Sequence, residues 1–178
     1  MSKIQMNLVT VIVPTYNRKF SLKECMYSVL NQSYDNFELL IMDDGSTDGT
    51  AEIVKDFKDN RIVYEWNENS GGPANPRNRG VLKSKGEYVA FLDADDLWYQ
   101  DKLLVSVNAL NSGMDVVYHD VDYKYNKASK RIESKNLTPP VLSYLLTNGN
   151  PMVNSSVVVR KSILQKVGLQ NESIEYAS

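Results

Sequence analysis

The sequence predicts an α/β fold in which helices flank a mostly parallel central sheet, and three observations support this. Short runs rich in β-branched residues alternate with amphipathic helical patterns along the chain. The first run, 8–13, is continuous, as expected of a strand that helices cover on both faces of the sheet. Polar loops follow three of the runs, and open α/β sheets bind their ligands beyond the carboxyl ends of the strands.

The individual elements follow from the same patterns. Strands are expected at 8–13, 37–44, 61–66, 87–96 and 114–123. Helices are expected at 21–32, 51–58, 77–84, 100–112 and 141–150. The charged segment 123–134 is expected to form a hairpin or a surface loop, and 155–167 a strand followed by a short helix.

Capping residues give the expected ends of these helices. Ser21 is expected to cap the first helix and Asp48 or Thr50 the second, since their side-chain oxygens accept bonds from free backbone N–H groups. The residues expected to end later helices are Gly86, Gly149 and Pro151.

Composition narrows the class of protein. The 178 residues carry a net charge of −2, with a pI near 5.5, so no basic stripe of the kind that binds nucleic acid is expected. The single cysteine, Cys25, forms no internal disulfide, which suits a reducing compartment and a cytoplasmic protein. No 18-residue apolar stretch or signal-peptide pattern is present, and no linker divides the chain. Residues 1–178 are therefore expected to form one domain.

Acidic residues follow the second predicted strand. Asp43 and Asp44 precede a Gly-Ser turn, and turn formation alone is one interpretation of Asp44. A calcium loop starting at Asp44 is excluded, because its twelfth position is Lys55 where a bidentate glutamate is required. The functional interpretation is a carboxylate that accepts hydrogen bonds from a base or a ribose.

Three carboxylates crowd four positions after the fourth predicted strand. They belong to Asp93, Asp95 and Asp96, and like charges so close repel one another unless a positive group lies among them. Their oxygens are ligands that Mg²⁺ or Mn²⁺ prefers, but they are too few to fill an octahedral shell. Such metals complete the shell with water and substrate phosphate oxygens, so the spacing indicates a diphosphate ligand.

Other nucleotide-binding and catalytic motifs are missing from the sequence. No Gly-x-x-x-x-Gly-Lys-Ser/Thr loop is present, and no Gly-x-Gly-x-x-Gly follows the first strand, which argues against P-loop and dinucleotide-binding domains. His119 is the only histidine, and no pairing with a nucleophile is indicated, so a structural role is favoured. Cys25 lies on the apolar face of its predicted helix and is expected in the core.

Four motifs together resemble a known family. In order they are "VTVIVPTYNR", "LLIMDDGSTDGT", "GGPANPRNRGV" and "YVAFLDADDLW". In this order and spacing they look like the family 2 glycosyltransferases, and the resemblance extends from about Leu8 to Glu172. It implies a GT-A fold, which is Rossmann-like.

The resemblance also implies which residues bind the nucleotide. Pro14, Thr15 and Tyr16 would pack on the nucleobase, with Arg18 near the phosphates. One carboxylate of the acidic pair, Asp43 or Asp44, would accept the base N3–H.

Further residues follow from the third and fourth motifs. Arg77 would approach the base and the acidic loop, and Asp93 would hold the ribose. Asp95 and Asp96 would contact Mn²⁺ or Mg²⁺. Tyr16 as a packing aromatic, and Arg77 with Arg79 as an exposed helix face, remain structural alternatives, and Trp98 is expected to be a core anchor.

The activity implied is an inverting transfer of a sugar from a nucleotide-diphosphate sugar to a glycan or lipid-linked hydroxyl, in surface polysaccharide synthesis. A carboxylate at the base favours a UDP-sugar, because uracil carries a proton at N3. Guanine offers N1–H similarly, whereas cytosine presents a bare acceptor. The alternatives are a nucleotide-sugar-binding module without transfer activity and a GT-A-like nucleotidyltransferase. The latter is expected to show a glycine-rich loop after the first strand, and "PTYNRKFS" has no glycine.

The chain departs from the family pattern at its end. Gly168, Asn171 and Glu172 match the segment that precedes the family's catalytic base, which is then expected just after Ser178. We therefore expect the N-terminal portion of a longer enzyme, whose remaining part supplies the base, much of the acceptor site and any membrane association.

Overall fold

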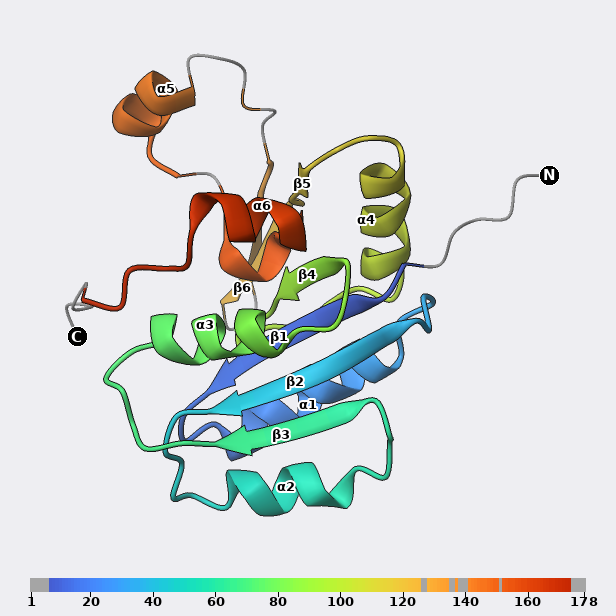
Figure 1. Cartoon of the computed structure of the whole chain (residues 1–178), viewed down its shortest axis with the longest axis vertical. Helices are drawn as coiled ribbons and strands as arrows, with labels where there is room; N and C mark the ends of the chain where they lie inside the picture. The colour runs from blue at the N-terminus through green and yellow to red at the C-terminus, as the bar shows by residue number, and fades with distance from the viewer. Residues whose placement is uncertain (1–6, 126–127, 135–136, 138–140, 151, 174–178) are drawn as a thin grey trace.

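The computed structural model describes residues 7–125, 128–134, 137, 141–150 and 152–173, and its centre is a sheet (Figure 1). Within these residues the sheet has six strands in the order β3–β2–β1–β4–β8–β5. Its first four strands are parallel, and β8 is antiparallel to both of its neighbours. The strands are β1 (Val9–Thr15), β2 (Phe37–Asp43), β3 (Ile62–Trp66), β4 (Tyr88–Phe91), β5 (Val116–Val117) and β8 (Val158–Arg160). The predicted fold class is confirmed.

Helices cover both faces of this sheet (Figure 1). On one face α1 (Lys19–Leu30), α2 (Thr50–Asp56) and α4 (Lys102–Asn111) pack in the larger apolar cluster. On the other, α3 (Ala74–Lys83) and α6 (Lys161–Val167) pack in the smaller one. Strand β1 contributes side chains to both clusters, because successive side chains point to opposite faces of a strand. Figure 1 shows α5 (Val141–Asn148) apart from the sheet, and a short 3-10 helix, η1 (Asn154–Ser156), leads into β8.

The fifth predicted strand, 114–123, is wrong as a single element. Its first part becomes β5 at the edge of the sheet, and its last part belongs to β6 (Val121–Tyr125). Strand β6 pairs with β7 (Ala128–Ile132) in a separate hairpin, so the hairpin expected at 123–134 is confirmed. Arg131 forms a fork with Asp122 inside this hairpin, at 2.8 and 2.9 Å, and Tyr99 Oη donates to Asp122 at 2.9 Å, which connects the hairpin to the loop after β4.

Capping differs from the sequence prediction at the first helix. Helix α1 begins at Lys19, and Ser21 lies inside it rather than at its cap. The Lys19 N–H donates to Asp48 Oδ2 at 3.1 Å, so a carboxylate from a distant loop replaces the local cap. At the second helix the N-cap is Gly49 rather than Asp48 or Thr50, although Asp48 Oδ1 accepts from the N–H of Thr50, the first helical residue, at 3.1 Å.

The other helix ends agree in part. Helix α3 begins at Ala74, earlier than expected, and ends at Lys83, so Gly86 does not end it. Gly149 has a φ of 77° and its N–H donates to the Leu145 carbonyl, which ends α5 as predicted. Pro151 lies outside the described residues.

Buried residues agree with the expected core. Cys25 and Trp98 are buried in the larger cluster, and burial together with the nearby aspartates raises the pKa of the Cys25 thiol. His119 Nε2 lies 2.9 Å from Ser106 Oγ, and burial, helped by the charge of Lys102, lowers the pKa of His119 to about 4. In the described part of the chain, no helix is both long enough and apolar enough to span a membrane.

Close packing of α3 on β1 depends on Gly80. A Cβ atom at that position would lie 2.5 Å from Ile12 Cγ2 and 3.0 Å from Ile12 Cδ1. Both contacts are shorter than carbon atoms tolerate without displacement. Glycine therefore sets the distance between α3 and the strand that it covers.

We predict that Gly80→Ala lowers the free energy of unfolding by about 1–3 kcal/mol, because the added methyl group displaces α3 from Ile12. Urea unfolding measures this. Leu82→Ala on the same helix is the matched control, since Leu82 is 71% exposed. Equal stability of the Gly80→Ala and wild-type chains would contradict the prediction.

Candidate nucleotide-binding site

A pocket of about 380 Å³ opens at the carboxyl ends of β1, β2 and β4. In an open α/β sheet this is the edge at which ligands bind. The loops after β1, β2, β3 and β4 and the first turn of α3 line it. The lining residues are Pro14, Thr15, Tyr16, Arg18, Asp44, Asn69, Gly71, Gly72, Pro73, Pro76, Arg77, Asp93, Ala94 and Asp95. The structure thus brings together eight of the residues singled out from the sequence: Pro14, Thr15, Tyr16, Arg18, Asp44, Arg77, Asp93 and Asp95.

The loop after β1 is fixed to the loop after β2. The Asn17 N–H donates to Ser46 Oγ at 2.8 Å, and Asn17 Oδ1 accepts from the Thr47 N–H at 2.9 Å. Asn17 has a φ of 50°, a left-handed conformation that asparagine tolerates better than most residues. These bonds hold Tyr16, which is half exposed, at the pocket wall.

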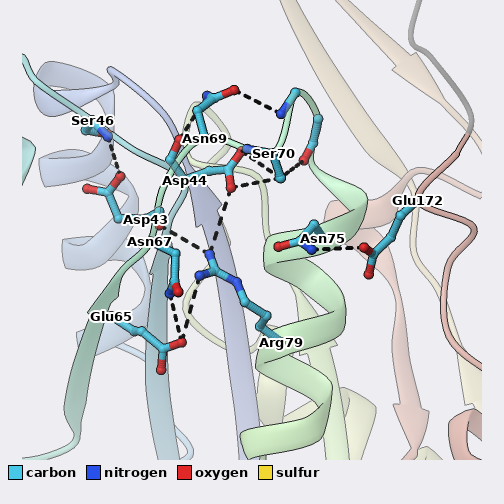
Figure 2. A network of polar contacts seen from close by, with 12 residues as sticks. Asp43, Asp44, Ser46, Glu65, Asn67, Asn69, Ser70, Asn75, Arg79 and Glu172 are labelled. Carbon is cyan, nitrogen blue, oxygen red and sulfur yellow. Dashed lines mark hydrogen bonds and ion pairs between the residues drawn. The ribbon is translucent and has the colours of Figure 1, made fainter.

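Asp44 is a buried carboxylate in the wall of the pocket, and its partners lie in the loop after β3 (Figure 2). Ser70 Oγ lies 2.9 Å from both carboxylate oxygens, and the Ser70 N–H donates to Oδ2 at 3.1 Å. Asn69 Nδ2 donates to the Asp44 carbonyl at 2.9 Å. Gly45 allows this approach, because a Cβ there would lie 2.8 Å from the Asn69 nitrogen and its φ is 93°. The loop after β3 therefore holds both the carboxylate and the carbonyl of Asp44.

Asp43 points elsewhere. Its Oδ1 accepts from the Ser46 N–H at 2.8 Å and its Oδ2 from Tyr64 Oη at 2.7 Å. Asp43 is fully buried and is not among the described residues that line the pocket. Of the acidic pair, only Asp44 faces the ligand space, because neighbouring side chains at a strand end point to opposite sides.

Arg77 connects α3 with the acidic loop after β4. Its Nη2 lies 2.5 Å from Asp93 Oδ1, while the arginine side chain is only 4% exposed. With its amide oriented to match, Asn154 Oδ1 accepts from both Nη atoms at 3.3 Å. Arg77 Nε and Thr15 Oγ1 are buried and have no hydrogen-bond partner in the described part of the chain.

The other two carboxylates of the acidic loop have different surroundings. Asp95 lines the pocket, is exposed, and forms a 3.7 Å ion pair with Arg18. Asp96 is not among the described residues that line the pocket, and it accepts a bond from Ser155 Oγ at 2.5 Å. Burial, with the charges of Asp93 and Asp95, raises the pKa of Asp96, although the Ser155 bond opposes that shift.

These surroundings bear on the fit of a divalent metal. Among the described residues, no group of three or more histidine, cysteine or acidic side chains converges to hold one. Asp95 offers an accessible carboxylate inside the pocket, so a cation fits there if phosphate oxygens complete its shell. The chemistry of this donor set is that of Mg²⁺ or Mn²⁺.

Comparison with known proteins identifies the family. The model of "Glycosyl transferase family 2" matches residues 10–168. The chain belongs to family 2 of the glycosyltransferases.

Individual relatives agree with that assignment. An uncharacterized glycosyltransferase of Rickettsia felis is 40% identical over 126 residues, which are 71% of this chain and 21% of that protein. WfaP of Escherichia coli, named a UDP-Glc:alpha-D-GlcNAc-diphosphoundecaprenol beta-1,3-glucosyltransferase, is 32% identical over 171 residues, 96% of this chain and 66% of that protein. The chain thus spans about a fifth of the Rickettsia relative and about two thirds of WfaP.

Solved structures show the same fold. Residues 1–349 of S. aureus TarS superpose with a TM-score of 0.80 at 25% identity, covering 95% of this chain and 52% of that one. The TarS structure in complex with UDP gives 0.79 at 26% identity, with the same coverage. The fold of this family 2 chain is therefore the GT-A fold.

Sequence patterns did not identify several residues around the site of this glycosyltransferase. Asn69 and Ser70 lie in the loop between β3 and α3, just before the third motif, and Ser155 lies 59 positions beyond Asp96. The alternative that Arg77 and Arg79 form an exposed helix face is wrong, since their side chains are 4% and 17% exposed. The proline-rich start of α3 was the sequence feature that could have indicated their location, because it puts both arginines in the first two turns of a helix that begins at the pocket.

We predict that Ser155→Ala destabilises the acidic loop by about 1–3 kcal/mol, because a buried bond partner is lost on each side. Ser155 Oγ accepts from the Asp93 N–H at 3.0 Å and donates to Asp96 at 2.5 Å. Thermal unfolding measures the loss. Ser156→Ala is the matched control, because Ser156 Oγ donates only to the Val153 carbonyl in the described part of the chain. A larger loss of stability in Ser156→Ala than in Ser155→Ala would contradict this interpretation.

Proposed function

We propose that this chain binds the donor in a glycosyltransferase that moves a sugar from a UDP-sugar to a hydroxyl of a glycan or lipid-linked acceptor. The observation that supports it most directly is one pocket lined both by Asp44 and by the acidic loop of Asp93 and Asp95. The first carboxylate suits a base that carries an N–H, and the second group suits a diphosphate with its counter-ion.

At the nucleobase end, Asp44 accepts the N3–H of uracil in this proposal, while Pro14, Thr15 and Tyr16 form the wall on which the base packs. WfaP is named for the donor UDP-Glc, and TarS was solved in complex with UDP, which supports uracil over other bases.

At the phosphate end, Arg18 exchanges its ion pair with Asp95 for one with the diphosphate when the donor binds. Asp93 keeps its ion pair with Arg77 and binds the ribose. Mn²⁺ or Mg²⁺ held by Asp95, with Asp96 next to it, would neutralise the charge that grows on the departing diphosphate. Arg77, paired with Asp93, offsets part of the repulsion among the aspartates before the donor arrives.

The transfer itself is proposed to invert the anomeric centre. The acceptor hydroxyl attacks from the face opposite the diphosphate, and a general base takes its proton. WfaP is named for a diphosphoundecaprenol-linked acceptor, which supports a lipid-linked acceptor, surface polysaccharide synthesis and a cytoplasmic location at the inner face of the membrane.

Binding of UDP tests the base-binding role of Asp44. We expect Asp44→Asn to weaken UDP binding about tenfold, because it replaces a charge-assisted hydrogen bond of roughly 1.5–3 kcal/mol with a weaker neutral one. Isothermal titration calorimetry measures the affinity. Asp56→Asn is the control, since that exposed residue of α2 lies outside the pocket-lining set. Absence of UDP binding by the wild-type protein would refute the proposed function.

Binding of Mn²⁺ tests the role of Asp95. We expect the spectrum of free Mn²⁺, followed by electron paramagnetic resonance, to disappear when UDP and the wild-type protein are both present. Asp95→Asn is expected to weaken this Mn²⁺ binding at least about tenfold, through loss of a charged oxygen ligand. Asp35→Asn, in the loop before β2, is the control. Unchanged Mn²⁺ binding by Asp95→Asn would remove that residue from the metal site.

A further inference from the structure

Arg79 lies directly beneath the Asp44 carboxylate but does not line the pocket among the described residues (Figure 2). Its Nη2 donates to the Asp43 carbonyl at 3.2 Å and lies 4.0 Å from Asp44 Oδ1. The side chain is 17% exposed, and Asp44 is 5% exposed. Within the described residues, Arg79 is the one cation paired with Asp44.

The guanidinium is fixed from its other side. Its Nη1 lies 3.9 Å from Glu65 Oε1, and Glu65 is held by Lys83 at 2.7 Å and by Asn67 Nδ2 at 3.1 Å. Figure 2 shows Arg79 reaching from α3 between Glu65 and the Asp43–Asp44 pair. Arg79 therefore has a defined place between two acidic strand ends rather than a free position at the surface.

Asp44 is thus held by two separate segments. Ser70 contacts its carboxylate from the loop after β3, and Arg79 contacts it from α3. A carboxylate that reads one N–H of a ligand must present one oxygen in a fixed direction, because hydrogen bonds weaken steeply when misaligned. Ser70 Oγ lies close to both oxygens, whereas the Ser70 N–H bonds Oδ2 and Arg79 lies near Oδ1, so the two contacts together set the direction of the carboxylate.

Arg79 Nε and Nη1 are also buried without a hydrogen-bond partner among the described residues. Leaving guanidinium donors unsatisfied has a cost in stability. A role in fold stability alone therefore accounts poorly for an arginine at this position. A requirement for a positive charge beside Asp44 accounts for it better.

We propose that Arg79 is a positioning residue for base recognition, holding Asp44 so that its carboxylate accepts the N3–H of a uracil nucleotide. The inference rests on the proposed function, since it takes UDP as the ligand class. It goes further in assigning selectivity between bases to a residue that does not touch the ligand.

A purely structural role and a positioning role predict different results. If Arg79 only stabilises the fold, its loss weakens UDP and CDP binding alike. If it positions Asp44, its loss weakens UDP binding while CDP, which has a bare acceptor at N3, changes little. The ratio of the two dissociation constants separates these cases.

The experiment measures the dissociation constants of UDP and CDP by calorimetry, at constant Mn²⁺, for the wild-type full-length protein and for Arg79→Met. The wild-type protein is expected to favour UDP at least about tenfold, and Arg79→Met to reduce that preference to about threefold or less. Arg79→Lys is the second variant, used if Arg79→Met fails to fold. Arg79→Lys keeps a positive charge but loses the forked guanidinium that lies between Glu65 and Asp44. It is expected to lose part of the preference for UDP over CDP.

Lys83→Ala is the matched control, because it removes another α3 cation that pairs with Glu65 and not with Asp44. Its preference for UDP is expected to equal the wild-type value. If a folded Arg79 variant keeps the full preference, or if Lys83→Ala loses it equally, the inference is overturned while the proposed function stands. If the wild-type protein does not bind UDP, the proposed function fails and the inference falls with it.

Discussion

Compensation of negative charge at one edge of the sheet is the constraint on which the site depends. Parallel strands bring their carboxyl ends together, and in this chain two of those ends carry consecutive or nearly consecutive aspartates. Carboxylates so close are unfavourable unless cations lie among them. Helix α3 supplies two: Arg77 pairs with Asp93, and Arg79 pairs with Asp44.

That compensation requires α3 to lie close to β1. Gly80 follows Arg79 directly, and its lack of a Cβ leaves room for Ile12, so the residue that permits close packing is next to the arginine that pairs with Asp44. Buried ion pairs contribute little net stability, since the loss of hydration offsets their attraction. Their value here is geometric, because each arginine fixes the direction of one acidic loop.

The three aspartates of the loop after β4 have different partners. Arg77 holds Asp93, Ser155 holds Asp96, and Asp95 keeps only an exposed pair with Arg18. The three carboxylates therefore do not form a ready-made metal site in the described residues. A ligand that brings its own oxygens, as a diphosphate does, suits this arrangement better than a free cation.

Local pattern in the sequence determined the fold class, most of the strands and helices, and the strand ends at which the pocket lies. It did so because periodicity, turns and loop composition depend on neighbouring residues. Tertiary structure decided which side chains face the ligand space. Asp43 and Asp44 are adjacent and chemically identical, yet only Asp44 lines the pocket, because its direction follows from the register of β2 beside β1. The burial of Arg79 and the bond from Ser155 to Asp96 depend likewise on contacts between distant segments, which no local pattern records.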